Sequence, residues 1–134
     1  MMLEIDKVIE TNFILLTPDM NLGYVLKNAV AKSSRNHFPV VNSKNEFLGV
    51  VRLDDIIHLM FDATMYDKVS VASLMHADVG IIIYEKDTMN VIMDKFKSTG
   101  AWNLPVIKNG KYYGYISKSK LLTAYRRQLL NFTQ

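Results

Sequence analysis

The sequence predicts a mixed α/β (α+β) fold in which one β-α-β-β-α unit occurs twice. A short apolar run that contains proline is found at residues 38–41 and again at residues 104–107. Each is followed by a turn and by a second apolar run around a glycine, at residues 47–51 and 112–116. The prolines are 66 residues apart (105 − 39) and the glycines are 65 apart (114 − 49), so the two copies keep one order and nearly one spacing. Such a repeat predicts two like modules packed by internal pseudo-symmetry.

The first repeat begins with an apolar run at residues 13–16, which predicts a strand. Asn21 is placed to cap a helix, because apolar residues recur with helical spacing after it. The two apolar runs of this repeat predict a hairpin across the turn-rich residues 42–45. A helix expected at residues 54–60 completes the repeat.

The second repeat follows the same order. Residues 79–84 predict its first strand, and Thr88 is placed to cap the helix that follows, which Gly100 ends. The pair Asn109-Gly110 predicts a tight hairpin turn between the next two strands. The last predicted element is a helix at residues 119–130.

The composition fits a globular domain and excludes several classes of protein. Of 134 residues, 49% are hydrophobic and 22% are charged, which is ordinary for a folded domain. The chain has no cysteine, which excludes a disulfide framework and a thiolate metal site. No apolar run approaches the roughly 20 residues of a membrane helix. The three histidines lack metal-ligand spacing and no nucleophile–base arrangement is present, so neither a metal site nor catalysis is expected.

The net charge of +3 does not predict a nucleic-acid partner. The basic excess lies late in the chain, at Lys108, Lys111, Lys118, Lys120, Arg126 and Arg127. A nucleic-acid surface would show a denser cluster, with aromatic residues among the basic ones. We therefore interpret these residues as a solvated face, with cations near the end of a terminal helix, where the helix dipole favours them.

The tandem β-α-β-β-α unit, with proline in its second strand and glycine in its third, resembles a pair of CBS domains, the arrangement called a Bateman module. We place the first repeat at residues 8–62, a connector at residues 63–77 and the second repeat at residues 78–130. The connector contains a helical turn at residues 71–75. The resemblance implies that the two repeats are related by pseudo-two-fold symmetry and pack through their sheets. It also implies a non-catalytic regulatory domain that requires no cofactor.

Several stretches further resemble the cytoplasmic C-terminal CBS pair of bacterial ClC-type chloride channels and transporters. They are residues 54–61, 65–68, 100–106 and 117–120 and the pair Tyr125-Arg126. The resemblance implies a domain at the cytoplasmic face of the inner or plasma membrane, without direct membrane insertion, which modulates or stabilises an attached transmembrane chloride channel domain. It also implies a homodimer formed through the CBS helices. The helix residues expected at that contact are apolar: Ile56, Ile57, Met60, Leu121, Leu122 and Tyr125.

Many CBS pairs bind adenosine nucleotides, and the family's motif for this is Ser/Thr-x-x-Asp after the third strand. Its carboxylate accepts hydrogen bonds from the ribose hydroxyls. The first repeat keeps Asp55 but has Arg52 in place of the hydroxyl, whereas the second keeps Ser117 but has Lys120 in place of the carboxylate. An ammonium cannot accept a hydrogen bond, so the second site is not expected to hold a nucleotide in this way. The residues on its base side offer no aromatic ring for stacking: Arg35, Asn36 and His37.

The other site is less altered, and two interpretations of it stay open. In the first, Asp55 binds the ribose of ATP, ADP or AMP, the base contacts Ala101, Trp102 and Asn103 with the indole stacked on adenine, and Arg52 meets the phosphates. In the second, Trp102 packs between the repeats and Asp55 caps the helix that it opens. We expect a regulatory CBS pair that acts through protein contacts, and the alternative is an adenine-nucleotide-sensing module with a single intact half-site.

Overall fold

The computed structural model describes residues 4–133, which fold as two compact units. We call Phe13–Asp78 the first-repeat unit, and Met1–Asn12 together with Val79–Gln134 the second-repeat unit. Each unit contains helices and β-strands, so the predicted mixed α/β fold with two repeats is confirmed. The segment before residue 13 belongs to the unit of the second repeat, although it precedes the first repeat in the chain.

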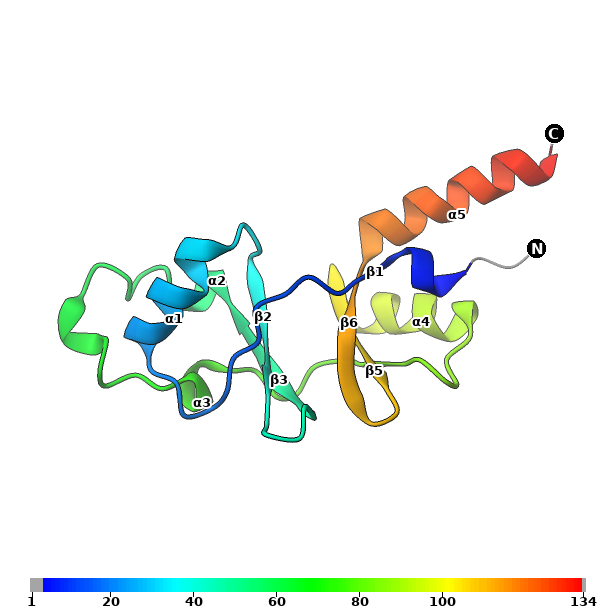
Figure 1. Ribbon diagram of the computed structural model, residues 1–134. Coiled ribbons are helices and arrows are strands. Elements are labelled where there is room, and N and C mark those ends of the chain that lie inside the picture. Colours follow the sequence, from blue (N-terminus) through cyan, green and yellow to red (C-terminus); the bar gives the residue numbers. More distant parts are fainter. Residues whose placement is uncertain (1–3, 134) are drawn as a thin grey trace. The chain divides into compact units, whose positions relative to one another are not determined.

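The second-repeat unit contains a four-stranded sheet in the order β1-β6-β5-β4. Its strands are β1 (Ile9–Glu10), β4 (Ile82–Ile83), β5 (Asn103–Lys108) and β6 (Lys111–Ser117). β4 runs parallel to β5, and the other neighbouring strands are antiparallel. Its helices are the 3-10 turn η1 (Ile5–Lys7) and the α-helices α4 (Met89–Thr99) and α5 (Lys118–Thr133). In Figure 1, α5 leaves the end of β6 and runs away from the sheet.

Local sequence signals set the ends of these elements. The Thr88 side chain accepts a hydrogen bond from the Val91 N–H and caps α4, and the helix ends at Gly100, whose φ is 67°. Asn109 and Gly110 have positive φ angles of 53° and 75°, the conformation that a tight hairpin turn requires. The helix cap, the helix stop and the hairpin turn are thus confirmed as predicted.

The first-repeat unit is built on an antiparallel pair of strands, β2 (His37–Val41) and β3 (Phe47–Arg52). Its α-helices are α1 (Leu22–Asn28), α2 (Leu53–Ile56) and α3 (Val71–Leu74), and its 3-10 turns are η2 (Val30–Lys32) and η3 (Ala63–Met65). Asn21 caps α1 as predicted, because its side chain accepts a hydrogen bond of 2.8 Å from the Tyr24 N–H.

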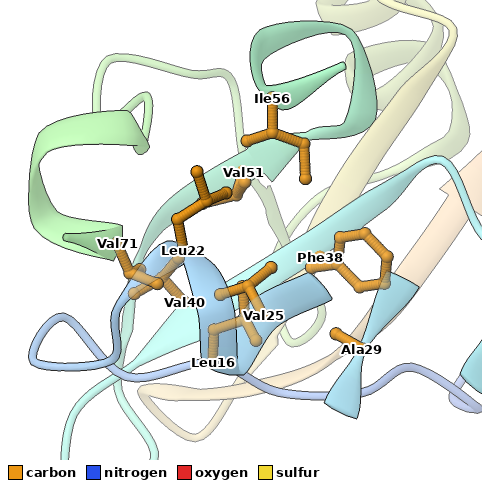
Figure 2. Packing of buried hydrophobic residues seen from close by; sticks show 9 residues of the cluster. All are labelled: Leu16, Leu22, Val25, Ala29, Phe38, Val40, Val51, Ile56 and Val71. Atoms are coloured by element: carbon orange, nitrogen blue, oxygen red, sulfur yellow. The ribbon is translucent and has the colours of Figure 1, made fainter. Parts of the chain in front are cut away.

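The buried side chains form one hydrophobic cluster in each unit. In the first-repeat unit, nine fully buried residues from the three helices, the hairpin and the segment before α1 pack together (Figure 2). Leu22, Val25 and Ala29 recur at intervals of three and four residues, so one side of α1 faces the hairpin. In the second-repeat unit, Val8 joins buried residues of α4, α5 and the strands β4, β5 and β6. Removing this apolar surface from water is the main stabilising contribution to each unit.

Two predicted strands are shorter than expected. Residues 13–16 form no strand, and only Leu16 bridges to β2. The parallel pairing cannot extend toward residue 14, because the donor needed for the next hydrogen bond would be the N–H of residue 39, which is proline. The strand expected at residues 79–84 is reduced to β4. After β4 the chain turns, because the Ile83 carbonyl accepts hydrogen bonds from the Lys86 and Asp87 N–H groups at 3.2 and 2.9 Å. The Asp87 carboxylate in turn accepts a hydrogen bond of 2.8 Å from the Ile83 N–H.

The helix expected at residues 54–60 is also shorter. It begins at Leu53 and ends at Ile56, after which the chain continues in turns. The hydroxyl of Tyr66 donates a hydrogen bond to the Met60 carbonyl, so this carbonyl bonds to a side chain and not to a further helical turn. Within residues 4–133, no helix combines the length and the apolar character needed to cross a bilayer.

The glycine repeated at the centre of the third strand allows a close backbone approach in both units. His76 exchanges backbone hydrogen bonds of 2.8 and 3.0 Å with Val50, and a Cβ on Gly49 would lie 2.6 Å from the His76 carbonyl oxygen. In the second-repeat unit β1 pairs with β6, and a Cβ on Gly114 would lie 2.6 Å from the Glu10 carbonyl oxygen. Only glycine fits at such a distance. The segments that contain Glu10 and His76 therefore hold matching positions, and we call them the lead-in segments.

Candidate functional site

Asp55 lies in the first turn of α2, where its carboxylate contacts a lead-in segment. The helix begins at Leu53, and Arg52 holds the cap position without any side-chain cap hydrogen bond. Oδ2 of Asp55 lies 2.8 Å from Nε2 of His76. The interpretation of Asp55 as the cap of this helix is therefore wrong, because the residue lies inside the first turn and not before it. Its side chain is 32% exposed, so it is accessible from solvent.

Arg52 stands where the Ser/Thr-x-x-Asp motif has its hydroxyl. A guanidinium has no acceptor and cannot cap a helix, so the backbone supplies a contact in its place. The Leu53 N–H donates a hydrogen bond of 2.8 Å to the Asn36 carbonyl. The matching bond in the second-repeat unit runs from the Lys118 N–H to the Trp102 carbonyl, also at 2.8 Å. Both units thus tie the start of the helix after the third strand to the loop before the proline-containing strand.

Trp102 is a surface residue. Its side chain is 70% exposed, and the Lys118 ammonium lies 5.2 Å from the centre of the indole, within the range of a cation–π contact. The indole is therefore not part of the buried cluster of its own unit, and its packing between the repeats stays a prediction. Its neighbour Ala101 is half-buried, and Asn103 is exposed and begins β5.

The five predicted site residues are divided between the two units. Arg52 and Asp55 flank the start of α2, where they present a cation and an acceptor. Residues 101–103 are consecutive at the start of β5, where they present an aromatic face and an amide. The described side chains include no group of three or more His, Asp or Glu residues that could hold a metal ion.

The matching motif in the second-repeat unit stabilises its own helix. The Ser117 hydroxyl accepts a hydrogen bond of 3.3 Å from the Lys120 N–H and so caps the first turn of α5. The Lys120 ammonium lies 3.6 Å from Oε1 of Glu10 in β1. Because an ammonium carries only donors, this position cannot accept hydrogen bonds from a sugar.

Sequence reasoning missed three residues near these positions, Glu10, Phe13 and His76. An aromatic ring from outside residues 35–37 lies beside them. The Phe13 ring lies 4.3 Å from the Arg35 guanidinium and 5.0 Å from the His37 ring. It was missed because it lies far upstream in the sequence. The repeat itself could have identified Glu10 and His76, because they are 66 residues apart (76 − 10), as the two prolines are.

The apolar helix residues expected at a dimer contact are not all on the surface. Ile56 and Leu121 are fully buried in the clusters of their own units, so their assignment to a contact surface is wrong. The other four are at least partly exposed: Ile57, Met60, Leu122 and Tyr125. Of these, Ile57 is 49% and Tyr125 is 39% exposed, and α5 exposes Leu130 further along, at 62%.

The sequence matches the protein family described as CBS domain twice, at residues 5–62 and 71–127. The two matches together include most of the chain and correspond to its two repeats. No curated protein matches the sequence.

Solved structures of CBS proteins share the fold. The structure of CbpB in complex with c-di-AMP is 19% identical, with a TM-score of 0.75 over 98% of this chain and 90% of that one. A CBS domain-containing protein of unknown function from Bacillus anthracis is 11% identical, with a TM-score of 0.76 over 93% of this chain and 94% of that one. A CBS domain protein from Streptococcus pneumoniae TIGR4 is 18% identical, with a TM-score of 0.73 over 92% and 87%. At these identities the likeness concerns the fold.

Proposed function

The chain belongs to the CBS domain family, and we propose that this CBS pair is a non-catalytic regulatory module that binds an adenine nucleotide. The observation that carries the proposal is the exposure of the two residues expected to hold the ligand, 32% for the Asp55 side chain and 70% for Trp102. Neither is committed to a core or to a helix cap, so both can contact a molecule from solvent. CbpB, which has the same fold, was solved with c-di-AMP, a ligand that contains adenine.

Each proposed site residue has a chemical role. Asp55 accepts hydrogen bonds from ribose hydroxyls, and a charged acceptor makes these bonds stronger than a neutral one would. Trp102 stacks on adenine, a contact worth about 1–3 kcal/mol per base. Asn103 offers amide donors and acceptors to the base edge, beside Ala101. Arg52 pairs with phosphate, for which its planar fork of donors is suited. ATP, ADP and AMP all present these groups, whereas c-di-AMP shares the adenine but keeps only the 2′ hydroxyl free on each ribose.

Nucleotide binding regulates only if the ligand has a different affinity for two conformations of the protein. The module would then report the nucleotide to the protein of which it is a part. The proposal needs no chemical step on the ligand, because a bound nucleotide shifts the balance of conformations by binding alone.

Calorimetric titration with ATP, ADP, AMP, adenosine and c-di-AMP tests the proposal. Trp102 is the only tryptophan in the chain, so its fluorescence reports on this residue alone. We expect Asp55→Ala to weaken binding roughly 10- to 100-fold, the loss of a charged hydrogen-bond acceptor. Asp54→Ala is the matched control, because Asp54 is an exposed carboxylate in the same turn and is expected to leave affinity unchanged. Flat titrations up to millimolar nucleotide, or full affinity in Asp55→Ala, would contradict the proposal.

We also propose that the module dimerises through its helices and is part of a ClC-type chloride channel or transporter at the cytoplasmic face of a membrane. The sequence stretches that resemble those proteins support the attachment, and the exposed Ile57 and Tyr125 support the contact. An exposed apolar residue on the helix of a small domain is a candidate for burial against a second copy.

Light scattering tests the dimer. We expect Ile57→Lys and Tyr125→Lys each to lower the apparent mass toward that of one chain, because a buried lysine in the contact would lose its hydration. Tyr24→Lys is the control, since Tyr24 is 48% exposed but lies on α1. A single-chain mass for the unaltered protein contradicts the dimer. The attachment is tested separately by grafting the module onto a ClC-type transporter in place of its own CBS pair, and absence of chloride flux in vesicles contradicts it.

A further inference from the structure

Each unit has a contact between an acidic and a basic side chain that joins the helix after its third strand to a lead-in segment, and the acidic and basic positions are exchanged between the units. In the first-repeat unit, Oδ2 of Asp55 lies 2.8 Å from Nε2 of His76. In the second-repeat unit, Nζ of Lys120 lies 3.6 Å from Oε1 of Glu10. The helix residues are 65 apart (120 − 55) and the lead-in residues are 66 apart (76 − 10), which is the spacing of the repeat. The two pairs are therefore equivalent, with acid and base exchanged.

The backbone holds the lead-in segments in place independently of these side chains. His76 exchanges hydrogen bonds of 2.8 and 3.0 Å with Val50 through backbone atoms, and Gly49 leaves room for its carbonyl. Glu10 pairs with Tyr115 in the ladder between β1 and β6. Loss of the imidazole would therefore leave the segment attached to β3. What the imidazole adds is its contact with the Asp55 carboxylate.

We propose that His76 is an internal ligand of Asp55 that an adenine nucleotide displaces when it binds. This inference rests on the proposed function, in which Asp55 accepts hydrogen bonds from the ribose. A ribose diol that donates to both carboxylate oxygens needs Oδ2, so its hydroxyl and the imidazole, whose Nε2 lies 2.8 Å from this atom, draw on the lone pairs of the same oxygen. Nucleotide and His76 therefore compete for one acceptor, and His76 lowers the affinity of the site.

The pair is weak enough for a ligand to displace it. The side chains of His76 and Asp55 are 43% and 32% exposed, and ion pairs open to solvent to this degree contribute little to stability. The equivalent residue in the second-repeat unit, Lys120, cannot exchange its partner Glu10 for a ribose hydroxyl donor, because an ammonium has no hydrogen-bond acceptor. Of the two equivalent positions, only the one at Asp55 can exchange an internal partner for a nucleotide.

Titration of His76 variants with AMP and ATP tests the competition. We expect His76→Ala to bind about two- to fivefold more tightly than the unaltered protein, the gain from losing a partly exposed pair. His76→Gln keeps an amide donor and is expected to stay close to the unaltered protein. Glu10→Ala is the matched control, because it breaks the equivalent pair in the other unit and leaves Asp55 untouched.

The outcomes separate this inference from the function on which it rests. Binding that is unchanged or weaker in His76→Ala overturns the competition, while the nucleotide function stands. Absence of binding by both proteins up to millimolar nucleotide overturns the function and the competition with it. Thermal unfolding of Asp55→Ala, His76→Ala and the double variant gives a check that needs no ligand. Additive shifts in Tm would mean that the two side chains do not interact in solution, which also overturns the inference.

Discussion

A charged residue with little exposure to solvent ties β4 to α4 in the second-repeat unit. The Asp87 carboxylate is 2% exposed and accepts hydrogen bonds from the Lys95 ammonium at 2.5 Å and from the Ile83 N–H at 2.8 Å. Lys95 also donates to the Ile81 carbonyl at 2.8 Å. Burial acts to raise the pKa of Asp87, but the hydrogen bonds from Lys95 and Ile83, together with the charges of Lys95 and Lys86, outweigh it and lower the pKa. The ionised carboxylate therefore stabilises the folded state.

This contact predicts a pH-dependent effect of Asp87→Asn. A carboxyl group whose folded-state pKa is lowered contributes stability above its ordinary value of about 4, and the contribution is lost as the pH falls through the lowered value. We expect Asp87→Asn to reduce the free energy of unfolding by about 1–2 kcal/mol at pH 7 and by less at about pH 3. Urea unfolding at the two pH values measures the difference. Asp94→Asn, an exposed carboxylate on α4, is the control, and an equal loss for Asp87→Asn at both pH values would contradict the argument.

The end of a helix or strand can be predicted from the sequence when residues close to that end determine it. Asn21 and Thr88 cap their helices, and Gly100 ends one, because each acts on backbone within a few residues. The extent of a strand depends on distant partners. An apolar run such as residues 13–16 therefore predicts a strand that the structure reduces to one bridge at Leu16.

The candidate site follows the same division. The repeat places Asp55 directly after the third strand, so its position at the start of α2 could be predicted. The repeat spacing relates His76 to Glu10, but it does not predict the contact of His76 with Asp55, because that contact depends on a backbone pairing between β3 and a segment beyond the end of the repeat. The exposure of Trp102 is likewise a property of the folded loop. From the sequence alone, an aromatic residue beside an apolar strand could be either buried in the core or exposed on the surface.

At the scale of the whole molecule, the two folded units are not consecutive halves of the sequence, because the second-repeat unit contains residues from both ends of the chain. Residues 4–12 belong to the second-repeat unit, where β1 extends the sheet along β6 and Val8, 2% exposed, joins the buried cluster. The sequence near residue 8 indicates a short lead-in segment, but it does not show that this segment pairs with β6. A strand of two residues is too short for a periodic pattern, and its partner lies about a hundred residues further along the chain. The second repeat therefore depends on a segment that precedes the first.

Removal of the N-terminal segment is expected to weaken the second repeat and not the first. Deletion through Glu10 removes β1 and Val8, and Val8→Ala is a milder variant that should cost about 2 kcal/mol by leaving a cavity. Hydrogen exchange checks both. We expect faster exchange in β6 and α4 of the second-repeat unit, while the amides of Val40 and Val51 in the first-repeat hairpin keep their protection. Equal loss in both units would mean that the segment stabilises the chain as a whole, and faster exchange in β2 and β3 alone would assign it to the first repeat.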